Sequence, residues 1–414
     1  MSTDPSDRRA FGAKVAHLRK QRGMKQEDLA AAIGRTASWV SQVERGVQPV
    51  VRLDVLQLLA DGLDVSVQVL SPEAPTASPV PPPEEQEPND LDEARLLISG
   101  HPALDVVLGR VEPGSGPTLQ ELSVAVEEVW ELTHAARFAE LSVALGRLLP
   151  RLERASRTAA REERPEFQAL LSGTYQALAA SFVRQDEADA AWVAADRSIR
   201  AAEQSERPLQ VFAGIYRLAQ AFVRLKHLDQ AEHAAASAVS VLQSYVDSND
   251  AEPESLSVLG ALHLVLALVY ARGGQRIEAR REIQNARSVA SRVGEDRNDF
   301  NLEFGPTNVE IQAVSTAVDL GDAGEALDIG QRINASSLSN ERRSRLLMDL
   351  GRAHAQRRHI GEALDSLLRA EELAPETVRT HTAARASIRE LVLIAGRSAP
   401  KELLDLAERA GVAD

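Results

Sequence analysis

Gln26-Glu27-Asp28-Leu29-Ala30 and, ten residues on, Val40-Ser41-Gln42-Val43-Glu44-Arg45-Gly46 form the stretch that decides the fold of the N-terminal part of this chain. The spacing of apolar residues predicts one helix over residues 26–33 and a second helix through the later run. Gly34 supplies a tight turn between them, and Thr36 is placed to cap the later helix through its hydroxyl. The stretch therefore predicts two short helices around a sharp turn.

The later helix has an outer face of small and amide side chains. Helical spacing turns Val40 and Val43 toward the core. The residues on the opposite face are Ala37, Ser38, Ser41 and Gln42. Such side chains suit insertion into the major groove of DNA, where bulk would hold a helix away from the base edges. The pattern predicts a helix-turn-helix; a small helical bundle that does not bind DNA is the alternative.

A preceding helix is predicted over residues 11–22. Its apolar residues, such as Val15 and Leu18, are spaced to face the core, while Arg19 falls on the outer side. Gly23 ends this helix, because glycine readily adopts the left-handed conformation that terminates helices.

Residues 8–71 as a whole resemble the Cro and phage-repressor type of helix-turn-helix domain, the XRE family. The matching residues are Leu18-Arg19, Arg22-Gly23-Met24, Gln26, Leu29-Ala30, Gly34, Ser41-Gln42-Val43-Glu44-Arg45-Gly46, Leu53 and Leu56 to Ala60. The resemblance implies a five-helix bundle that binds double-stranded operator DNA. It also implies that DNA is contacted by Gln26, Thr36, Ala37, Ser38, Ser41 and Gln42, with Arg45 near the DNA backbone.

Two positions depart from the family pattern. Lys25 stands where the family has a Ser or Thr cap, and Arg35 stands where it has a small apolar residue. In addition, Ala37 has no hydrogen-bonding group in its side chain. We therefore expect base recognition to depend on Ser38, Ser41 and Gln42.

The charge of the chain is unevenly distributed. Residues 1–71 hold ten Lys and Arg against eight Asp and Glu, about +2, although the whole chain has a net charge of −14. An acidic protein with one slightly basic end is compatible with DNA binding by that end alone. Because this charge predicts weak non-specific affinity from one copy, we expect a homodimer that occupies two half-sites.

Residues 72–90 differ sharply in composition from their surroundings. Seven of the nineteen prolines of the chain lie between Pro72 and Pro88, together with four glutamates and no basic residue. Such a segment neither continues a helix nor buries apolar surface. It is predicted to be an extended linker, either a passive spacer or a Pro-rich docking motif.

From residue 91 to residue 414 the pattern is helical and repeats. The clearest unit is Leu347, Leu350-Gly351, His354, Ala363, Leu367, Ala370 and Pro375, and less regular copies precede it. Small residues that mark the second helix of each copy are Ala191, Ala231, Ala279, Ala326 and Ala363. Their steps of 37 to 48 residues exceed the 34 of strict tetratricopeptide repeats, so longer helices or loops are expected.

This half resembles tetratricopeptide-like (TPR-like) repeats, and the combination with the N-terminal domain is similar to that of many actinobacterial regulators. The resemblance implies an all-α protein with a C-terminal α-solenoid of five to seven helix pairs, including less regular helices over 91–108, 117–135 and 138–161. Each pair has an apolar face that only its neighbours cover. The first helices would line a concave groove able to bind a peptide or small-molecule effector.

The stretch Phe304-Gly305-Pro306-Thr307-Asn308 predicts a helix that begins at Pro306. Thr307 and Asn308 would then lie in its first turn, where Asn308 could point into the groove and hold the backbone amide of a ligand. The alternative is a purely structural helix start with an exposed asparagine.

Several kinds of chemistry have no sequence signature here. The chain has no cysteine and no phosphate-binding loop, its histidines are scattered, and no nucleophile has a base at a recognisable offset. The apolar run from Val258 to Ala271 is too short to span a bilayer and predicts a buried helix. The pairs Arg342-Arg343 and Arg357-Arg358 are interpreted as solvated helix faces. We therefore expect no catalytic site, cofactor, metal or membrane partner.

The sequence as a whole predicts a cytoplasmic, nucleoid-associated transcriptional regulator whose repeat half dimerises, senses a ligand, or does both. A protein-interaction adaptor, in which the small domain only tethers the repeats to DNA, is the alternative. An enzyme in the helical half is a further one.

Overall fold

The computed structural model describes residues 5–33, 37–47, 50, 53–63, 65, 67–70, 91–101, 103–104, 117–248, 251–335 and 339–412. These residues form helices joined by turns and short loops, together with an isolated β-bridge between Arg297 and Phe304. The chain divides into two compact units, Met1–Glu87 and Pro88–Asp414. The predicted linker, residues 72–90, lies outside the described residues. The all-α prediction is confirmed.

In its described residues the N-terminal unit contains five helices: α1 (Pro5–Gln21), α2 (Gln26–Ala32), α3 (Ala37–Glu44), α4 (Leu53–Gly62) and α5 (Val67–Leu70). They enclose one apolar core, to which each helix contributes fully buried side chains, among them Val15, Leu29, Val43, Leu59 and Leu70. The predicted helix end at Gly23 is present, with φ at +67°. The predicted turn at Gly34 and cap at Thr36 lie outside the described residues.

Arg19 is buried, so the prediction that it lies on the outer face of the first helix was wrong. Only 7% of Arg19 is exposed to solvent. Its guanidinium group turns inward because it pairs with the carboxylate of Glu44 at the end of α3.

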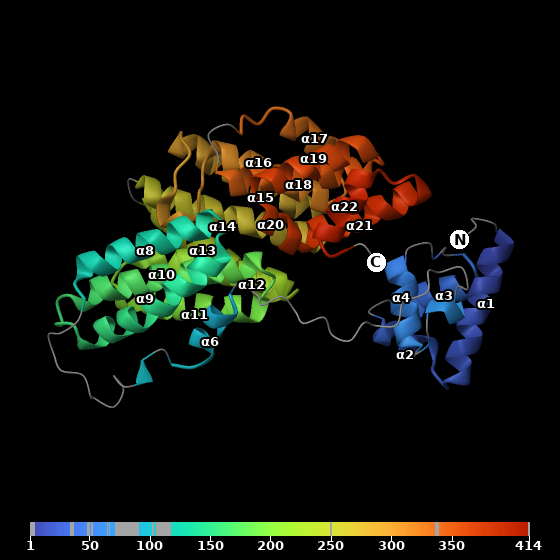
Figure 1. Ribbon diagram of the computed structural model, residues 1–414, viewed down its shortest axis with the longest axis horizontal. Coiled ribbons are helices and arrows are strands. Elements are labelled where there is room, and N and C mark those ends of the chain that lie inside the picture. The colour runs from blue at the N-terminus through green and yellow to red at the C-terminus, as the bar shows by residue number, and fades with distance from the viewer. Residues whose placement is uncertain are drawn as a thin grey trace. The chain divides into compact units, whose positions relative to one another are not determined.

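The C-terminal unit is built from antiparallel helix pairs that follow one another in chain order (Figure 1). Six pairs are described: α8 (Leu119–His134) with α9 (Phe138–Thr158), α10 (Arg164–Arg184) with α11 (Ala188–Gln204), α12 (Pro208–Arg224) with α13 (Leu228–Ser248), α14 (Pro253–Arg272) with α15 (Arg276–Val293), α16 (Pro306–Asp319) with α17 (Ala323–Gly330), and α18 (Asn340–Gln356) with α19 (Ile360–Leu373). From α10 to α18 the first helix of each pair also contacts the first helix of the next pair. This is the stacking expected of a solenoid.

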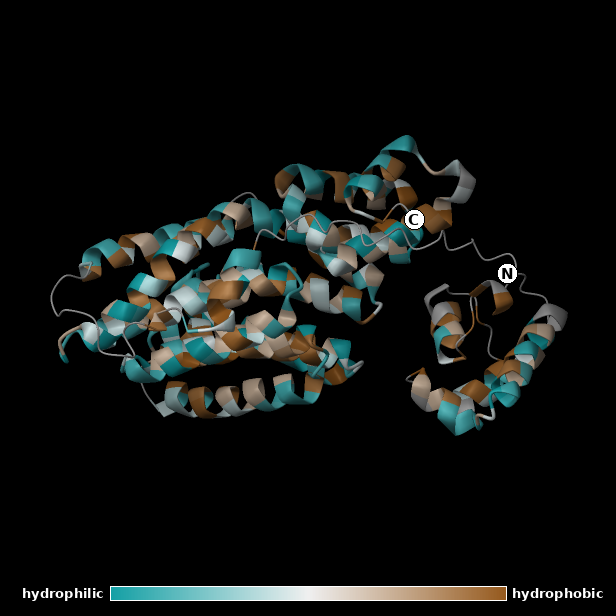
Figure 2. Ribbon diagram, turned by 60° about the horizontal axis from the view of Figure 1, so that its bottom comes forward, coloured by the Kyte–Doolittle hydropathy of each residue, from teal (hydrophilic) through white to brown (hydrophobic). Residues whose placement is uncertain are grey.

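Shorter helices flank the six pairs. α6 (Asp92–Ser99) precedes them, and α20 (Pro375–Thr380), α21 (Thr382–Ala395) and α22 (Lys401–Arg409) follow. The helix expected over 91–108 is thus shorter in its described part, while those expected over 117–135 and 138–161 correspond to α8 and α9. In both units hydrophobic and hydrophilic residues alternate along the helices, as in amphipathic helices (Figure 2).

The predicted repeat markers lie in the core of this unit. Ala191, Ala231, Ala279, Ala326 and Ala363 each have no exposed surface and lie in the second helix of successive pairs. Small residues at these positions allow the two helices of a pair to approach closely. The long steps also have structural causes, because α13 has 21 residues, α14 has 20, and residues 294–305 separate α15 from α16.

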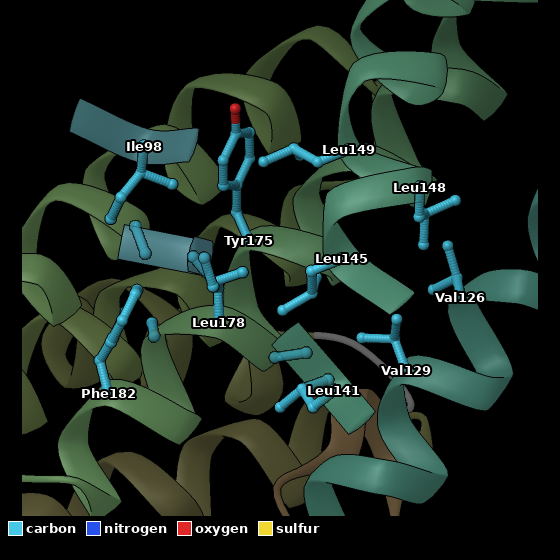
Figure 3. Packing of buried hydrophobic residues seen from close by; sticks show 14 of the residues in the cluster. Ile98, Val126, Val129, Leu141, Leu145, Leu148, Leu149, Tyr175, Leu178 and Phe182 are labelled. Atoms are coloured by element: carbon cyan, nitrogen blue, oxygen red, sulfur yellow. The ribbon is translucent and has the colours of Figure 1, made fainter. Parts of the chain in front are cut away.

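One apolar core of the unit lies around α10. Figure 3 shows Tyr175, Leu178 and Phe182 of this helix in one apolar cluster with leucines of α9; Leu149 lies beside Tyr175, and Leu145 lies beside Leu178. All five side chains are almost completely buried. The α10 helix therefore has apolar neighbours on several sides, which explains why it is buried over most of its length.

The α14 helix is strongly apolar. Its mean hydropathy reaches 1.7, and by length and composition alone it could cross a bilayer. However, 83% of the helix segment with this hydropathy is buried inside the unit. It is therefore a core helix, as predicted. The expectation that it is too short to span a bilayer was wrong, because the helix extends beyond the run from Val258 to Ala271 and covers Pro253–Arg272.

Candidate nucleic-acid interface

The α3 helix contains four of the residues predicted to contact DNA, Ala37, Ser38, Ser41 and Gln42. Ser41 and Gln42 are half-buried on its surface, and Arg45, directly after the helix, is exposed. The Arg45 side chain folds back along the helix, with Nε donating to the carbonyl oxygen of Ser41 at 3.2 Å. Ala37 is partly buried and packs against the core, so it offers little contact surface. Ser38 lies in α3, and Thr36 lies outside the described residues.

Glu44 connects the last turn of α3 to α1 and α2. Its Oε1 accepts from Nε of Arg19 at 2.5 Å, and its Oε2 accepts from Nη2 of the same residue at 3.1 Å. Oε2 also accepts from Nε2 of Gln26 at 2.7 Å. Arg19 in turn donates to the carbonyl oxygen of Met24 at 2.6 Å. The three helices are thus held together by one bidentate ion pair and its hydrogen bonds.

The environment of Glu44 favours its charged form. Burial by itself raises the pKa of a carboxyl group, but hydrogen bonds from Arg19 and Gln26 outweigh burial and hold the pKa of Glu44 below its ordinary value. The carboxylate therefore stays charged at neutral pH, and the ion pair that fixes α3 persists.

A close backbone approach also positions α1 against this same end of α3. A Cβ atom on Gly12 of α1 would lie 2.3 Å from the carbonyl oxygen of Val43, so only glycine allows α1 to cross α3 at this distance. Together with the Arg19–Glu44 pair, this contact determines how α3 presents Ser41 and Gln42.

Gln26 therefore has a structural partner that the sequence did not suggest. Its side-chain amide donates to Glu44, which orients the first residue of α2 toward the end of α3. Sequence analysis also missed the role of Glu44, because Arg19 and Glu44 lie 25 residues apart in the chain. The contact of Gln26 with DNA remains a prediction, as do the DNA contacts of Ser38, Ser41, Gln42 and Arg45.

In the repeat unit, the residues predicted to line the groove are engaged within the protein. Asn308 is buried, and its Oδ1 accepts a hydrogen bond from Nη1 of Arg342. The backbone N–H of Thr307 donates to Asp296 at 2.9 Å. The helix does begin at Pro306, but the alternative of an exposed asparagine there was wrong. Binding of a ligand by Thr307 and Asn308 stays a prediction.

Arg342 also corrects the interpretation of the arginine pairs. Rather than lying on a solvated face, its side chain donates to Glu303 as well as to Asn308. Arg357 and Arg358 are exposed, as predicted. Arg342 lies in the first turn of α18, the first helix of its pair, which faces residues 294–305. Arg357 and Arg358 instead lie in a turn after α18.

Residues 294–305 fill part of the surface formed by the first helices. Phe304 has no exposed surface and packs over Gly260 of α14, where a Cβ atom would lie 1.9 Å from the phenyl ring. Asn301 makes two anchoring contacts, from its Oδ1 to Nε2 of His134 at 3.0 Å and from its carbonyl oxygen to Nη2 of Arg217 at 2.7 Å. The segment is therefore attached to α8, α12 and α14.

Two small cavities lie among the first helices. They have volumes of about 90 and 60 Å³ and are lined mainly by α10, α12, α14, α16 and α18, the first helices of their pairs. The larger cavity also touches residues 301–303, and the smaller one touches His381 and Ala383. Among the described residues no group of three His, Asp or Glu side chains is arranged to hold a metal ion.

Comparison with known proteins bears on the N-terminal unit. Residues 10–72 match a protein family described as a helix-turn-helix domain. No curated protein matches the chain. Among solved structures, the chain is similar to Bacillus thuringiensis PlcR in complex with the peptide PapR7 and DNA, with 12% identity, a TM-score of 0.34, and coverage of 91% of this chain and 99% of PlcR. The N-terminal unit is thus a helix-turn-helix domain.

Proposed function

We propose that this protein is a sequence-specific, DNA-binding transcriptional regulator of the XRE type rather than an enzyme. The observation that carries the proposal is the α3 helix, whose surface bears Ser41 and Gln42 and whose end is fixed by the Arg19–Glu44 pair. A helix held in this way presents hydrogen-bonding side chains to base edges without further ordering. In this proposal Ser38, Thr36 and Gln26 add further contacts to DNA, and Arg45 leaves the carbonyl oxygen of Ser41 to bind a phosphate.

The protein acts as a homodimer in this proposal. The residues up to 71 carry only about +2, so one copy gains little from the phosphate backbone. Two copies on half-sites about 34 Å apart double the contact surface. The repeat unit supplies the dimer contact, senses an effector, or does both, and the Pro-rich residues 72–90 connect it to the DNA-binding domain. Such a regulator works in the cytoplasm, on the nucleoid.

Selection of bound duplexes from a random DNA library tests the proposal. The full chain is expected to enrich one short sequence, present as two inverted copies one helical turn apart or a multiple of it. A protein-interaction adaptor would instead retain DNA without enriching any sequence. Sedimentation of the same protein with the selected duplex gives the stoichiometry. Equal affinity for the duplex in dimeric and monomer-trapped protein would contradict the role of the dimer.

A further inference from the structure

The two cavities of the repeat unit are parts of one narrow slot. They share seven lining residues, which come from α10, α12, α14, α16 and α18: Val183, Gln220, Leu268, Gln312, Ser315, Arg345 and Asp349. The larger part ends at residues 301–303, and the smaller part ends at His381. A slot of this volume accommodates a slender small molecule and excludes a folded protein partner.

Three arginines at the smaller end have unused hydrogen-bonding capacity. Arg224, Arg272 and Arg345 line this end, and no hydrogen bond from their guanidinium groups is found among the described residues. Each makes only a long ion pair, at 3.8 Å to Asp186, 3.5 Å to Asp319 and 3.7 Å to Glu341, respectively. The N–H donors of each guanidinium group that do not face its paired carboxylate therefore remain available for a ligand.

A fourth arginine in the same wall shows the contrast. Arg352 donates to Asp319 at 2.6 Å and to Asp349 at 2.7 Å, so its charge is well compensated. Among the described residues that line the smaller cavity, Asp319 and Asp349 are the acidic ones, against four arginines. Asp186 and Glu341, which pair with Arg224 and Arg345, do not belong to this lining, so arginines outnumber carboxylates at the cavity surface itself.

The arginines at the smaller end of the slot repel one another. Burial, followed by repulsion from Arg272 and Arg345, lowers the pKa of Arg224 to about 10. His381 has its pKa lowered as well, first by burial and then by the surrounding arginines, so it stays neutral. Its Nδ1 accepts from the N–H of Ala384 at 3.2 Å, which leaves Nε2–H as a further donor. A bound anion would relieve this repulsion and accept from these donors.

The middle of the slot carries uncharged polar side chains beside Arg345, Asp349, Val183 and Leu268. Gln220, Gln312 and Ser315 line the middle. At the larger end, Arg217 is only 7% exposed, and its Nε has no hydrogen-bond partner among the described residues. A buried donor without a partner is unfavourable unless a ligand or water supplies an acceptor.

We propose that this slot is a binding site for a small organic anion. Its carboxylate or phosphate group is held by Arg224, Arg272 and Arg345, since guanidinium groups bind either group in a bidentate manner. Its uncharged polar part extends past Gln220 and Gln312 toward Arg217. Any effect of the bound anion on DNA binding rests on the proposed function. Binding of the anion to the slot does not.

Thermal unfolding of the full chain tests this site, with inorganic phosphate and succinate as the two probes. Ionic strength is held constant with sodium chloride, which also provides the baseline. At least one probe is expected to raise the midpoint in a saturable way; the more effective probe identifies phosphate or carboxylate as the preferred group. Isothermal titration then gives the dissociation constant.

Two substitutions and a matched control separate binding from folding. Arg224→Gln and Arg272→Gln are each expected to weaken the binding of the probe about tenfold or more, because a charge-assisted hydrogen bond is lost. Without a probe, neither variant should unfold at a lower temperature than the original protein, since repulsion is also removed. Arg389→Gln, at an exposed position on α21, should bind the probe unchanged.

The site is ruled out if neither probe produces a saturable shift, or if Arg224→Gln and Arg272→Gln respond to the probe as Arg389→Gln does. Binding of a selected duplex is measured on the same samples. Duplex binding without any anion response contradicts the anion site and leaves the proposed regulator intact. An anion response in a protein that binds no DNA sequence contradicts the regulator and leaves the site intact.

Discussion

Nε of Arg19 lies 2.5 Å from Oε1 of Glu44, and both side chains are more than nine-tenths excluded from solvent. The pair joins α1 to the end of α3, the helix that presents Ser41 and Gln42. A buried ion pair adds little net stability to the folded state. Removing one partner is nevertheless costly, because the other charge then stays buried without compensation. The orientation of α3 therefore depends on both residues.

Replacing Arg19 with methionine should destabilise the N-terminal unit by about 3 kcal/mol, because Glu44 would remain buried without its partner. Hydrogen exchange of peptides from residues 5–47 in the full chain measures this change. Lys20→Met removes an exposed charge one residue away and should change the free energy of unfolding by less than about 0.5 kcal/mol. The double variant Arg19→Met with Glu44→Leu should recover most of the loss; no recovery would show that the pair is not the cause.

Acid should weaken the same unit through Glu44. Its pKa is lowered in the folded protein, so its contribution is present above the pKa of an unfolded glutamate and is lost as the pH falls through the folded value. Between about pH 6 and pH 3, protection from hydrogen exchange in residues 5–47 should fall more steeply in the original protein than in Glu44→Gln. Parallel curves for the two proteins would contradict a lowered pKa of Glu44.

The burial of Arg19 also shows where sequence analysis reached its limit. The spacing of Val15 and Leu18 correctly gave the apolar side of α1, but spacing alone assigns every cation to the opposite side. Only the position of Glu44 in three dimensions reveals that Arg19 turns inward. In contrast, the repeat pattern predicted the buried positions Ala191 and Ala363 well, because close helix packing within a pair requires small residues at a regular interval.

Gly260→Ala should destabilise the repeat unit by about 1–3 kcal/mol, because a Cβ atom would overlap the ring of Phe304. Residues 294–305 should exchange their amide hydrogens faster as Phe304 is displaced. Gly146→Ala is the matched control, since it lies within α9 with open space around it and should stabilise the helix by about 0.5–1 kcal/mol. Shifts in the same direction for both variants would argue against the packing of Phe304.

Residues 294–305 were the part of the repeat unit least accessible to sequence analysis. The pattern predicted the helix start at Pro306 but not the buried Phe304 before it, since its partner Gly260 lies 44 residues earlier in the chain. A glycine within the otherwise apolar run from Val258 to Ala271 was the only available signal. The slot arginines were missed for a similar reason, because Arg224, Arg272 and Arg345 lie far apart in sequence and converge only in the stacked helices.

The affinity of the full chain for its selected duplex, measured with Gln42→Ala, tests most directly whether α3 reads DNA sequence. The loss of amide contacts to a base should weaken binding by about 1–3 kcal/mol, roughly five- to 150-fold, with affinity for unrelated DNA unchanged. Gln21→Ala, at an exposed position near the end of α1, should bind the duplex like the original protein. If Gln42→Ala and Gln21→Ala bind the selected duplex equally well, α3 does not read the sequence through Gln42 as proposed.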